Sequence, residues 1–371
     1  MRRALTLAAR GRGAVEPNPM VGCVIVKDGR TIGEGWHQRF GQPHAEREAL
    51  AACTEPPAGA TAYVTLEPCC HTNKKTPPCV PALIEAGVAK VVVGCLDPNP
   101  AVANQGVQQL RAAGIAVETG LLEASCKQLN APFFAKMLHG RPYVTLKWAQ
   151  SADGKVAGPA GQRCWISCPE SRRLVHELRA RCDAILTGIN TVLCDDPLLT
   201  ARDVPNARPL LRIVLDTGLR IPLTSQLVRT AREFPLLIIC SQSAHARQPD
   251  AVAALAAQNV RVAPLPTGAT GRVSLRDAIQ HLGTLPITHL LVEPGPMLAK
   301  AFLTEGAWDR LWIFRAPAAI CDATAPSAAP ADYAIAAETT IGVDRLTEML
   351  NPTSGIFHSV EPSADFPRAR R

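Results

Sequence analysis

Residues 61–69 read Thr61-Ala62-Tyr63-Val64-Thr65-Leu66-Glu67-Pro68-Cys69 and contain the pattern on which the fold prediction depends. The run 61–66 is rich in β-branched and aromatic residues, which predicts a strand. Pro68 and Cys69 follow this strand directly, and a second pair, Pro78-Cys79, begins the next helical pattern. Two cysteines in these positions are candidate metal ligands.

On both sides of this strand, short β-rich runs alternate with helical patterns. Asp28-Gly29 is the dipeptide of a tight hairpin turn, so we expect the runs beside it to pair. A hairpin followed by repeated strand–helix units predicts a three-layer α/β domain with a mixed sheet. The expected strands are 22–27, 31–36, 61–66, 90–94 and 115–119, and the expected helices are 44–53, 80–86 and 102–113.

The alternation stops before Gly140-Arg141-Pro142, and a new strand is expected over 143–147. We therefore expect a domain boundary there, with a first domain over 1–141 and a second domain over 142–371. The second domain alternates again, which predicts another α/β unit with a largely parallel sheet. Its further expected strands are 183–187, 211–216, 236–240, 260–263, 290–293 and 311–314, and its expected helices are 169–180, 251–258, 274–281 and 297–304.

The first half contains a candidate metal site. His44 and Glu46 stand at the start of the helix expected over 44–53. With Cys69 and Cys79, His44 provides one imidazole and two thiolates, which bind zinc and leave a fourth position for water. Zinc lowers the pKa of such a water toward neutrality. Glu46 is the candidate acid and base that takes the proton from this water and delivers it to a departing amine.

This arrangement resembles the zinc-dependent cytidine-deaminase superfamily, whose signature is H-x-E followed by P-C-x-x-C. Here nine residues, 70–78, separate Cys69 from Cys79, where the signature has two. The spacing places the chain outside the common nucleoside and transfer-RNA branches. Cys70 or His71 remains an alternative to Cys69 as the ligand.

Five motifs of the first half are Pro17-Asn18-Pro19-Met20-Val21-Gly22-Cys23-Val24-Ile25-Val26, His44-Ala45-Glu46, Tyr63-Val64-Thr65-Leu66-Glu67-Pro68-Cys69, Thr76-Pro77-Pro78-Cys79 and Asp97-Pro98-Asn99-Pro100. Together they resemble the deaminase half of the bifunctional riboflavin-biosynthesis deaminase/reductase family. The resemblance implies a cytidine-deaminase-like fold, Zn²⁺ as cofactor, and hydrolytic deamination of 2,5-diamino-6-ribosylamino-4(3H)-pyrimidinone 5′-phosphate. It also implies that Asn18 lines the pyrimidine pocket; the structural alternative is a turn residue between two prolines.

The second half has no G-x-G-x-x-G fingerprint after an expected strand. Instead, Leu290-Leu291-Val292-Glu293-Pro294-Gly295-Pro296-Met297 predicts a strand that passes through a glycine turn into a helix, whose first N–H groups can bind an anion. Two further motifs are Thr145-Leu146-Lys147-Trp148-Ala149-Gln150-Ser151-Ala152-Asp153-Gly154-Lys155 and Gly188-Ile189-Asn190-Thr191-Val192-Leu193-Cys194-Asp195-Asp196-Pro197-Leu198-Leu199-Thr200-Ala201-Arg202.

These two motifs are similar to the reductase half of the same family, which has a dihydrofolate-reductase-like fold. The resemblance implies NADPH-dependent reduction of the ribosyl group of 5-amino-6-(5-phosphoribosylamino)uracil to ribityl, with Lys147 and Asp153 near the reacting sugar. Arg163 stands two residues before Trp165, where the family often has a substrate-binding serine. The implied cofactor contacts are Trp165, Thr191, Gly295, Pro296, Met297, Leu298 and the helix to Ala301. The implied substrate contacts are Ser167, Arg179, Asp195, Leu198, Arg202 and Glu293.

Structural roles remain the alternatives at three of these positions. Arg179 could lie on a solvated helix face, Asp195 could cap a turn, and Trp165 could pack in a core. Arginine suits a phosphate because its planar guanidinium donates two parallel hydrogen bonds.

Composition excludes several other classes of protein. No stretch approaches the roughly 18 apolar residues of a membrane span, so we expect no membrane partner. The formal net charge of +7 is spread over the chain, which argues against nucleic-acid binding and suits a small phosphorylated pyrimidine. Thirteen cysteines and only a short apolar run after Met1 favour a reducing compartment and the cytoplasm. We also expect a homo-oligomer.

Two other functions are alternatives. One is a nucleobase or nucleic-acid deaminase with a non-catalytic second domain, which would not oxidise NADPH with the deaminated substrate. The other is a binding or regulatory protein with structural zinc, which would fill all four metal positions with protein ligands.

Overall fold

The computed structural model describes residues 1–71, 76–100, 102–159, 162, 164–204, 209–356 and 367. These residues divide into two compact units, Met1–His139 and the described residues from Gly140 onward. Arg163 lies outside the described residues. Among the described helices, none combines the length and the apolar character needed to cross a membrane.

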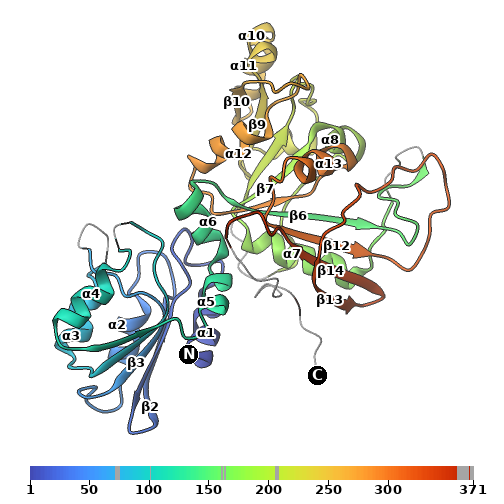
Figure 1. Ribbon diagram of the computed structural model, residues 1–371. Coiled ribbons are helices and arrows are strands. Elements are labelled where there is room, and N and C mark those ends of the chain that lie inside the picture. Colours follow the sequence, from blue (N-terminus) through green and yellow to red (C-terminus); the bar gives the residue numbers. More distant parts are fainter. Residues whose placement is uncertain are drawn as a thin grey trace. The chain divides into compact units, whose positions relative to one another are not determined.

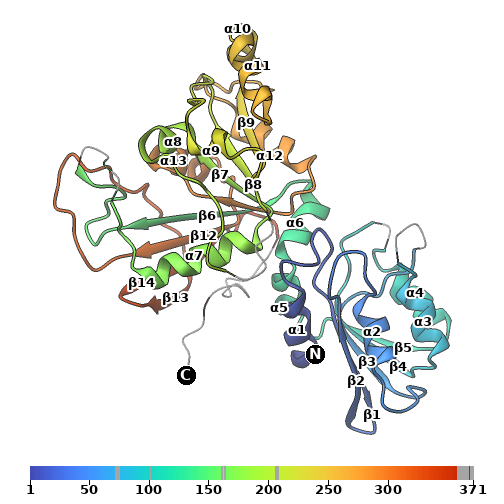
Figure 2. The same ribbon diagram turned by 180° about the vertical axis from the view of Figure 1, so that it is seen from behind.

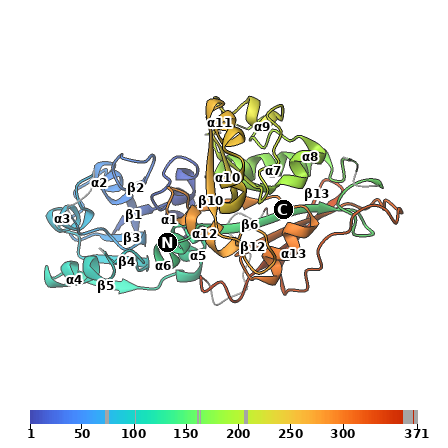
Figure 3. The same ribbon diagram turned by 90° about the horizontal axis from the view of Figure 1, so that it is seen from above.

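The first unit is built on a mixed sheet of five strands in the order β2-β1-β3-β4-β5, which can be followed in Figure 3. β1 pairs antiparallel with both β2 and β3, and β3, β4 and β5 run parallel to one another. This confirms the predicted hairpin and mixed sheet. The strands are β1 (Gly22–Lys27), β2 (Arg30–Trp36), β3 (Thr61–Leu66), β4 (Lys90–Cys95) and β5 (Ala116–Thr119).

Helices cover both faces of this sheet (Figures 1 and 2). α1 and α5 lie on one face, and α2, α3 and α4 lie on the other, which makes the three layers predicted from the strand–helix alternation. The helices are α1 (Arg2–Ala8), the short 3₁₀ helix η1 (Ala9–Gly11), α2 (Ala45–Ala51), α3 (Cys79–Glu85), α4 (Gln105–Ala112), α5 (Glu123–Leu129) and α6 (Ala131–His139).

Two glycines of β2 determine how closely α2 approaches the sheet. A Cβ atom at Gly33 would lie 2.3 Å from the carbonyl oxygen of Ala49, and one at Gly35 would lie 2.3 Å from the Ala49 nitrogen. Any larger side chain at either position would push α2 outward. Because α2 follows His44 and contains Glu46, this packing fixes where both side chains lie.

The second unit contains a sheet of nine strands in the order β10-β9-β8-β7-β11-β6-β12-β14-β13. The strands from β10 to β12 in this order are parallel, and β14 and β13 extend the sheet as an antiparallel hairpin. The largely parallel sheet was predicted, but the hairpin was not. The strands are β6 (Tyr143–Gln150), β7 (Ala184–Gly188), β8 (Leu211–Leu215), β9 (Leu236–Ser241), β10 (Val260–Leu265), β11 (His289–Val292), β12 (Arg310–Arg315), β13 (Ile335–Ile341) and β14 (Asp344–Leu350).

Alternate strand residues of this sheet enter two hydrophobic cores. Ile185 belongs to the core under α7 to α11, whereas its neighbour Leu186 belongs to the core under α12 and α13. Figures 1 and 2 show the two helix layers from opposite sides. The helices are α7 (Pro169–Arg181), α8 (Ile189–Asp195), α9 (Gln226–Arg229), α10 (Gln242–Arg247), α11 (Pro249–Ala257), α12 (Leu275–Gly283) and α13 (Pro296–Thr304).

Candidate active sites

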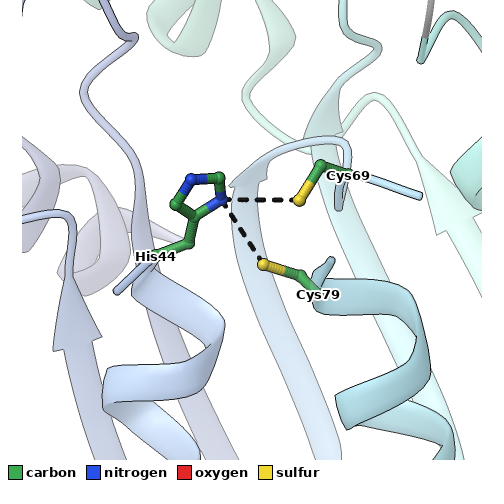
Figure 4. A group of neighbouring side chains, drawn as sticks. All are labelled: His44, Cys69 and Cys79. Atoms are coloured by element: carbon green, nitrogen blue, oxygen red, sulfur yellow. Dashed lines mark hydrogen bonds between the residues drawn. The ribbon is translucent and has the colours of Figure 1, made fainter. Parts of the chain in front are cut away.

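Three side chains of the first unit form a group that can hold a metal ion. The ligand atoms of His44, Cys69 and Cys79 all lie within 4.8 Å of one another. His44 Nδ1 faces both sulfurs, 3.4 Å from Cys69 Sγ and 3.5 Å from Cys79 Sγ (Figure 4). One nitrogen and two sulfurs are a donor set that Zn²⁺ prefers, so these residues fit a zinc ion with one coordination position left for a small molecule.

Each member of the group lies at the end of a secondary-structure element. His44 is the N-cap residue of α2, and Cys79 is the first residue of α3. Cys69 follows β3 and accepts hydrogen bonds on its carbonyl oxygen from the N–H groups of Cys79, at 3.0 Å, and Val80, at 3.2 Å. The strand end and the helix start are thus joined directly. Cys70 and His71, the alternatives to Cys69, are not part of the group.

The orientation of the His44 ring is set on its far side. Nε2 of His44 lies 3.1 Å from Thr76 Oγ1. If Nδ1 binds a metal ion, Nε2 carries the proton and donates it to this hydroxyl, which then holds the ring orientation. Thr76 belongs to the motif Thr76-Pro77-Pro78-Cys79, but no sequence pattern predicts its contact with His44.

Glu46 lies on the buried side of α2 and is only 3% exposed. Burial is the main cause that raises the pKa of its carboxyl above the ordinary value, and the neighbouring Cys69 adds to the effect. A carboxyl whose pKa is raised toward neutrality can both accept and return a proton. This environment supports the acid and base role expected for Glu46.

Asn18 is connected to the metal group through a histidine that the sequence analysis did not single out. Asn18 Nδ2 lies 3.2 Å from His37 Nε2, and the buried His37 ring packs edge-on against the His44 ring with centroids 5.2 Å apart. Nδ1 of His37 lies 3.1 Å from the carbonyl oxygen of Pro43. His37 follows β2 without a recognisable motif, so only the tertiary contact reveals it.

The second unit brings three predicted site residues together. Arg179 and Glu293 form a bidentate ion pair, with Nε to Oε1 at 2.8 Å and Nη2 to Oε2 at 2.9 Å. Burial alone would raise the pKa of Glu293, but the charges of Arg179 and Lys147 outweigh it and lower this pKa to about 2. Burial also lowers the pKa of Lys147. Two cations and one anion leave a net positive charge, which suits a phosphate.

The loop after α8 is held beside this cluster by its backbone. Arg179 Nη1 donates to the Thr200 carbonyl oxygen at 3.0 Å, and the Arg202 N–H donates to Nδ1 of His176 at 3.2 Å. The fully buried Arg212 donates to the Leu198 carbonyl oxygen at 3.2 Å. Leu198 and Arg202 are therefore fixed by their main chains.

The predicted anion site lies where two neighbouring parallel strands end. β7 passes through Gly188 into α8, and β11 leads through Gly295 into α13, whose first residues are Pro296, Met297 and Leu298. A Cβ atom at Gly295 would lie 3.5 Å from Thr191 Oγ1, and one at Gly188 would lie 3.5 Å from Cδ2 of Leu298. Both turns thus lie beside the start of α13, whose first N–H groups can bind an anion.

The other predicted residues of the second unit contact neither the Arg179–Glu293 pair nor the start of α13 in the bonds described below. Asp153 accepts hydrogen bonds from Ser151 and from the Ile320 and Cys321 N–H groups, and its pKa falls to about 2, chiefly because of Ser151. Trp165 is 69% exposed beneath the Arg172 guanidinium, so it does not pack in a core. Ser167 accepts a hydrogen bond from Arg172 on its carbonyl oxygen, and Asp195 ends α8 near Cys164.

Two family models match this chain. Residues 1–95 match the cytidine and deoxycytidylate deaminase zinc-binding region, and residues 142–331 match the RibD C-terminal domain. The protein is therefore an enzyme that combines a zinc-dependent deaminase with an NADPH-dependent reductase. The recognised resemblance and both predicted folds, cytidine-deaminase-like and dihydrofolate-reductase-like, are confirmed.

Full-length relatives identify the particular family. The riboflavin biosynthesis protein RibD of Aquifex aeolicus is 43% identical over 85% of this chain and 86% of its own length, and that of Escherichia coli is 43% identical with the same coverage. The chain belongs to the RibD family of bifunctional riboflavin-biosynthesis enzymes. The structure of Acinetobacter baumannii RibD is similar, with a TM-score of 0.81 and 37% identity over 94% of this chain and 97% of that one.

A Thermotoga maritima structure is similar as well, with a TM-score of 0.79 and 35% identity over 95% of this chain and 97% of that one. That protein is described as a diaminohydroxyphosphoribosylaminopyrimidine deaminase and 5-amino-6-(5-phosphoribosylamino)uracil reductase.

Proposed function

We propose that this chain carries out two successive steps on one phosphorylated pyrimidine. Residues 1–141 remove ammonia from 2,5-diamino-6-ribosylamino-4(3H)-pyrimidinone 5′-phosphate, and residues 142–371 reduce the ribosyl group of the resulting 5-amino-6-(5-phosphoribosylamino)uracil to ribityl. The observation that carries the proposal is the group of His44, Cys69 and Cys79 with the buried Glu46 beside it.

In the deaminase unit, His44, Cys69 and Cys79 would hold Zn²⁺, which when bound would act as a Lewis acid and lower the pKa of a water molecule. Glu46 takes the proton from the attacking water and delivers it to the departing amine, so that water enters and ammonia leaves. In this proposal Asn18, which contacts His37, binds the pyrimidine edge.

In the reductase unit, NADPH supplies the hydride when it is bound. The α13 start, with Gly295 to Leu298 and Thr191, binds the diphosphate of the cofactor, and Trp165 offers an exposed ring to it. Lys147, Arg179 and Glu293 bind the phosphorylated sugar and the pyrimidine. Asp153, Ser167, Asp195, Leu198 and Arg202 complete the proposed substrate site.

The compartment and assembly of the enzyme are further parts of the proposal. None of the thirteen cysteines forms a disulfide, which supports a reducing compartment such as the cytoplasm. We also infer a homo-oligomer. Sedimentation of the purified chain tests the assembly, and a monomer at micromolar concentration would contradict it.

The test of the two activities is an incubation of the purified full-length chain with the phosphorylated diaminopyrimidine, with and without NADPH. Mass spectrometry should detect the deaminated ribosyl product without NADPH and the ribityl product with it. Deamination without any NADPH oxidation would instead support a deaminase with a non-catalytic second domain.

A further inference from the structure

The loop between β4 and α4 lies against the two cysteine ligands. Val102, which is 1% exposed, forms a small hydrophobic cluster with Cys69 and Cys79. A buried aliphatic side chain packed with two cysteines limits the access of water and dissolved oxidants to them. We call residues 97–100 and 102–107 the cover segment. This segment shields one side of the metal group from solvent.

One buried carboxylate holds both ends of the cover segment. Glu67 is 3% exposed and lies between β3 and the ligand Cys69. Its Oε2 accepts hydrogen bonds from the N–H groups of Asp97, at 3.2 Å, and Asn104, at 2.9 Å. Its Oε1 accepts one from the Val107 N–H at 3.1 Å. Hydrogen bonds to an ionised acceptor are about twice as strong as neutral ones, so this carboxylate fixes the segment at both ends.

The first turn of α4 is also fitted closely to the residue between Glu67 and Cys69. A Cβ atom at Gly106 would lie 2.2 Å from the Pro68 carbonyl oxygen, which only glycine avoids. The cover segment thus contacts the Glu67-Pro68 backbone through the helix as well as through the carboxylate. Its position relative to Cys69 is determined by two independent sets of contacts.

We propose that Glu67 is a positioning residue for the metal centre, which keeps Val102 packed with Cys69 and Cys79 and thereby slows zinc loss and thiol oxidation. Glu67 touches neither sulfur in this role, because it acts through the cover segment. The inference rests on zinc binding at the proposed deaminase site.

The test compares three variants of the zinc-loaded full-length chain. Zinc release to an excess of the chelator 4-(2-pyridylazo)resorcinol is followed by absorbance, and thiol oxidation by hydrogen peroxide is followed by mass spectrometry of Cys69 and Cys79. We expect Val102→Ala and Glu67→Gln each to release zinc about tenfold faster, which corresponds to about 1.4 kcal/mol in the barrier. Val102→Ile, which retains an aliphatic cover, should release zinc as slowly as the wild type.

The matched control is Glu118→Gln, because Glu118 is an exposed carboxylate of the same unit that pairs with Lys90. It should leave both rates unchanged, and reductase activity should be unchanged in every variant. Wild-type rates in Val102→Ala would overturn the proposal even if Glu67→Gln failed to fold. A wild-type chain that binds no zinc would instead contradict the deaminase site itself.

Discussion

Glu46 and Glu293 are two largely buried carboxyls with opposite environments. Burial raises the pKa of Glu46, whose neighbours include the Cys69 thiol, whereas the charges of Arg179 and Lys147 lower the pKa of Glu293 to about 2. The raised pKa favours proton exchange by the first carboxyl, and the second remains charged and can only bind. The division of roles between the two sites follows from the neighbours of each carboxyl.

Replacing Glu46 by glutamine should retain zinc but abolish deamination. The amide keeps the shape of the side chain and cannot exchange the proton, so ammonia release should fall by at least about a hundredfold. Ammonia release and zinc content are measured on the same preparation. Glu48→Gln on the same helix is the control, because Glu48 only accepts a hydrogen bond from Gln38. Near-normal ammonia release by Glu46→Gln would contradict the assignment.

The Arg179–Glu293 pair should make the free energy of unfolding decrease at acidic pH. The pKa of Glu293 in the folded protein, about 2, lies below its ordinary value of 4.5. Between about pH 4.5 and pH 2, the unfolded state therefore binds more protons than the folded state. The stabilisation is fully present above about pH 4.5 and is lost as the pH falls toward 2. The difference in free energy of unfolding between wild type and Glu293→Gln, measured by urea titration, should shrink over that range. A difference independent of pH would refute the pairing.

At the scale of elements, the proposed cofactor site depends on two neighbouring strand–helix connections. β7 and β11 are adjacent and parallel, so the turns after them, at Gly188 and Gly295, lie at the same edge of the sheet. Neither glycine has a positive φ, so other residues could adopt the same backbone conformation. What distinguishes glycine at these two positions is the missing side chain. The absence of side chains lets a ligand approach the helix start.

Gly295→Val should therefore weaken cofactor binding without disturbing the fold. Gly295 has φ −72° and ψ 171°, which valine adopts readily, and its Cβ would meet only Thr191 Oγ1 at 3.5 Å. We expect the KM for NADPH to rise about tenfold, equivalent to about 1.4 kcal/mol, while deamination in the same chain is unchanged. An unchanged KM would show that the cofactor does not approach this turn.

The sequence predicted most strands because their apolar runs are buried on one or both faces. It missed both strands of the hairpin. β13, Ile335–Ile341, is a largely exposed edge strand that mixes alanine, glutamate and threonine without apolar alternation, whereas β14, Asp344–Leu350, was missed although most of its residues are buried. It also missed α8, because its seven residues are too few to show helical periodicity. Exposure removes the hydrophobic signal on which sequence patterns depend.

The sequence could predict those site residues that lie at the ends of helices and strands. It could not predict the residues that join the site only through tertiary contacts. His44 and Cys79 precede or begin helices, which the sequence indicates. Thr76 contacts His44 across 32 residues, and His37 contacts Asn18 across 19, and neither separation follows a local period. Such partners come from the packing of whole elements, which no short motif specifies.

At the scale of the whole molecule, each unit has its own sheet and its own cores. The five-stranded sheet contains only strands of Met1–His139, and the nine-stranded sheet contains only later strands. The residues proposed for each reaction belong to one unit each. The two activities should therefore respond separately to changes in their cofactors.

Removal of zinc should separate the two activities. Dialysis of the full-length chain against a chelator should abolish ammonia release, while NADPH oxidation with the deaminated substrate should continue at its original rate. Addition of Zn²⁺ should restore the first activity. Loss of both activities on chelation would contradict the assignment of zinc to the deaminase unit alone.

The interior position of β6 determines the order in which the chain can fold during synthesis. β6 is the first strand of its sheet to leave the ribosome, yet it pairs with β11 and β12, which are translated much later. The five strands of the other sheet are all available once Thr119 has emerged. The first unit of a nascent chain can therefore fold while β6 is still unpaired. An unpaired apolar strand is prone to aggregation at this stage of synthesis.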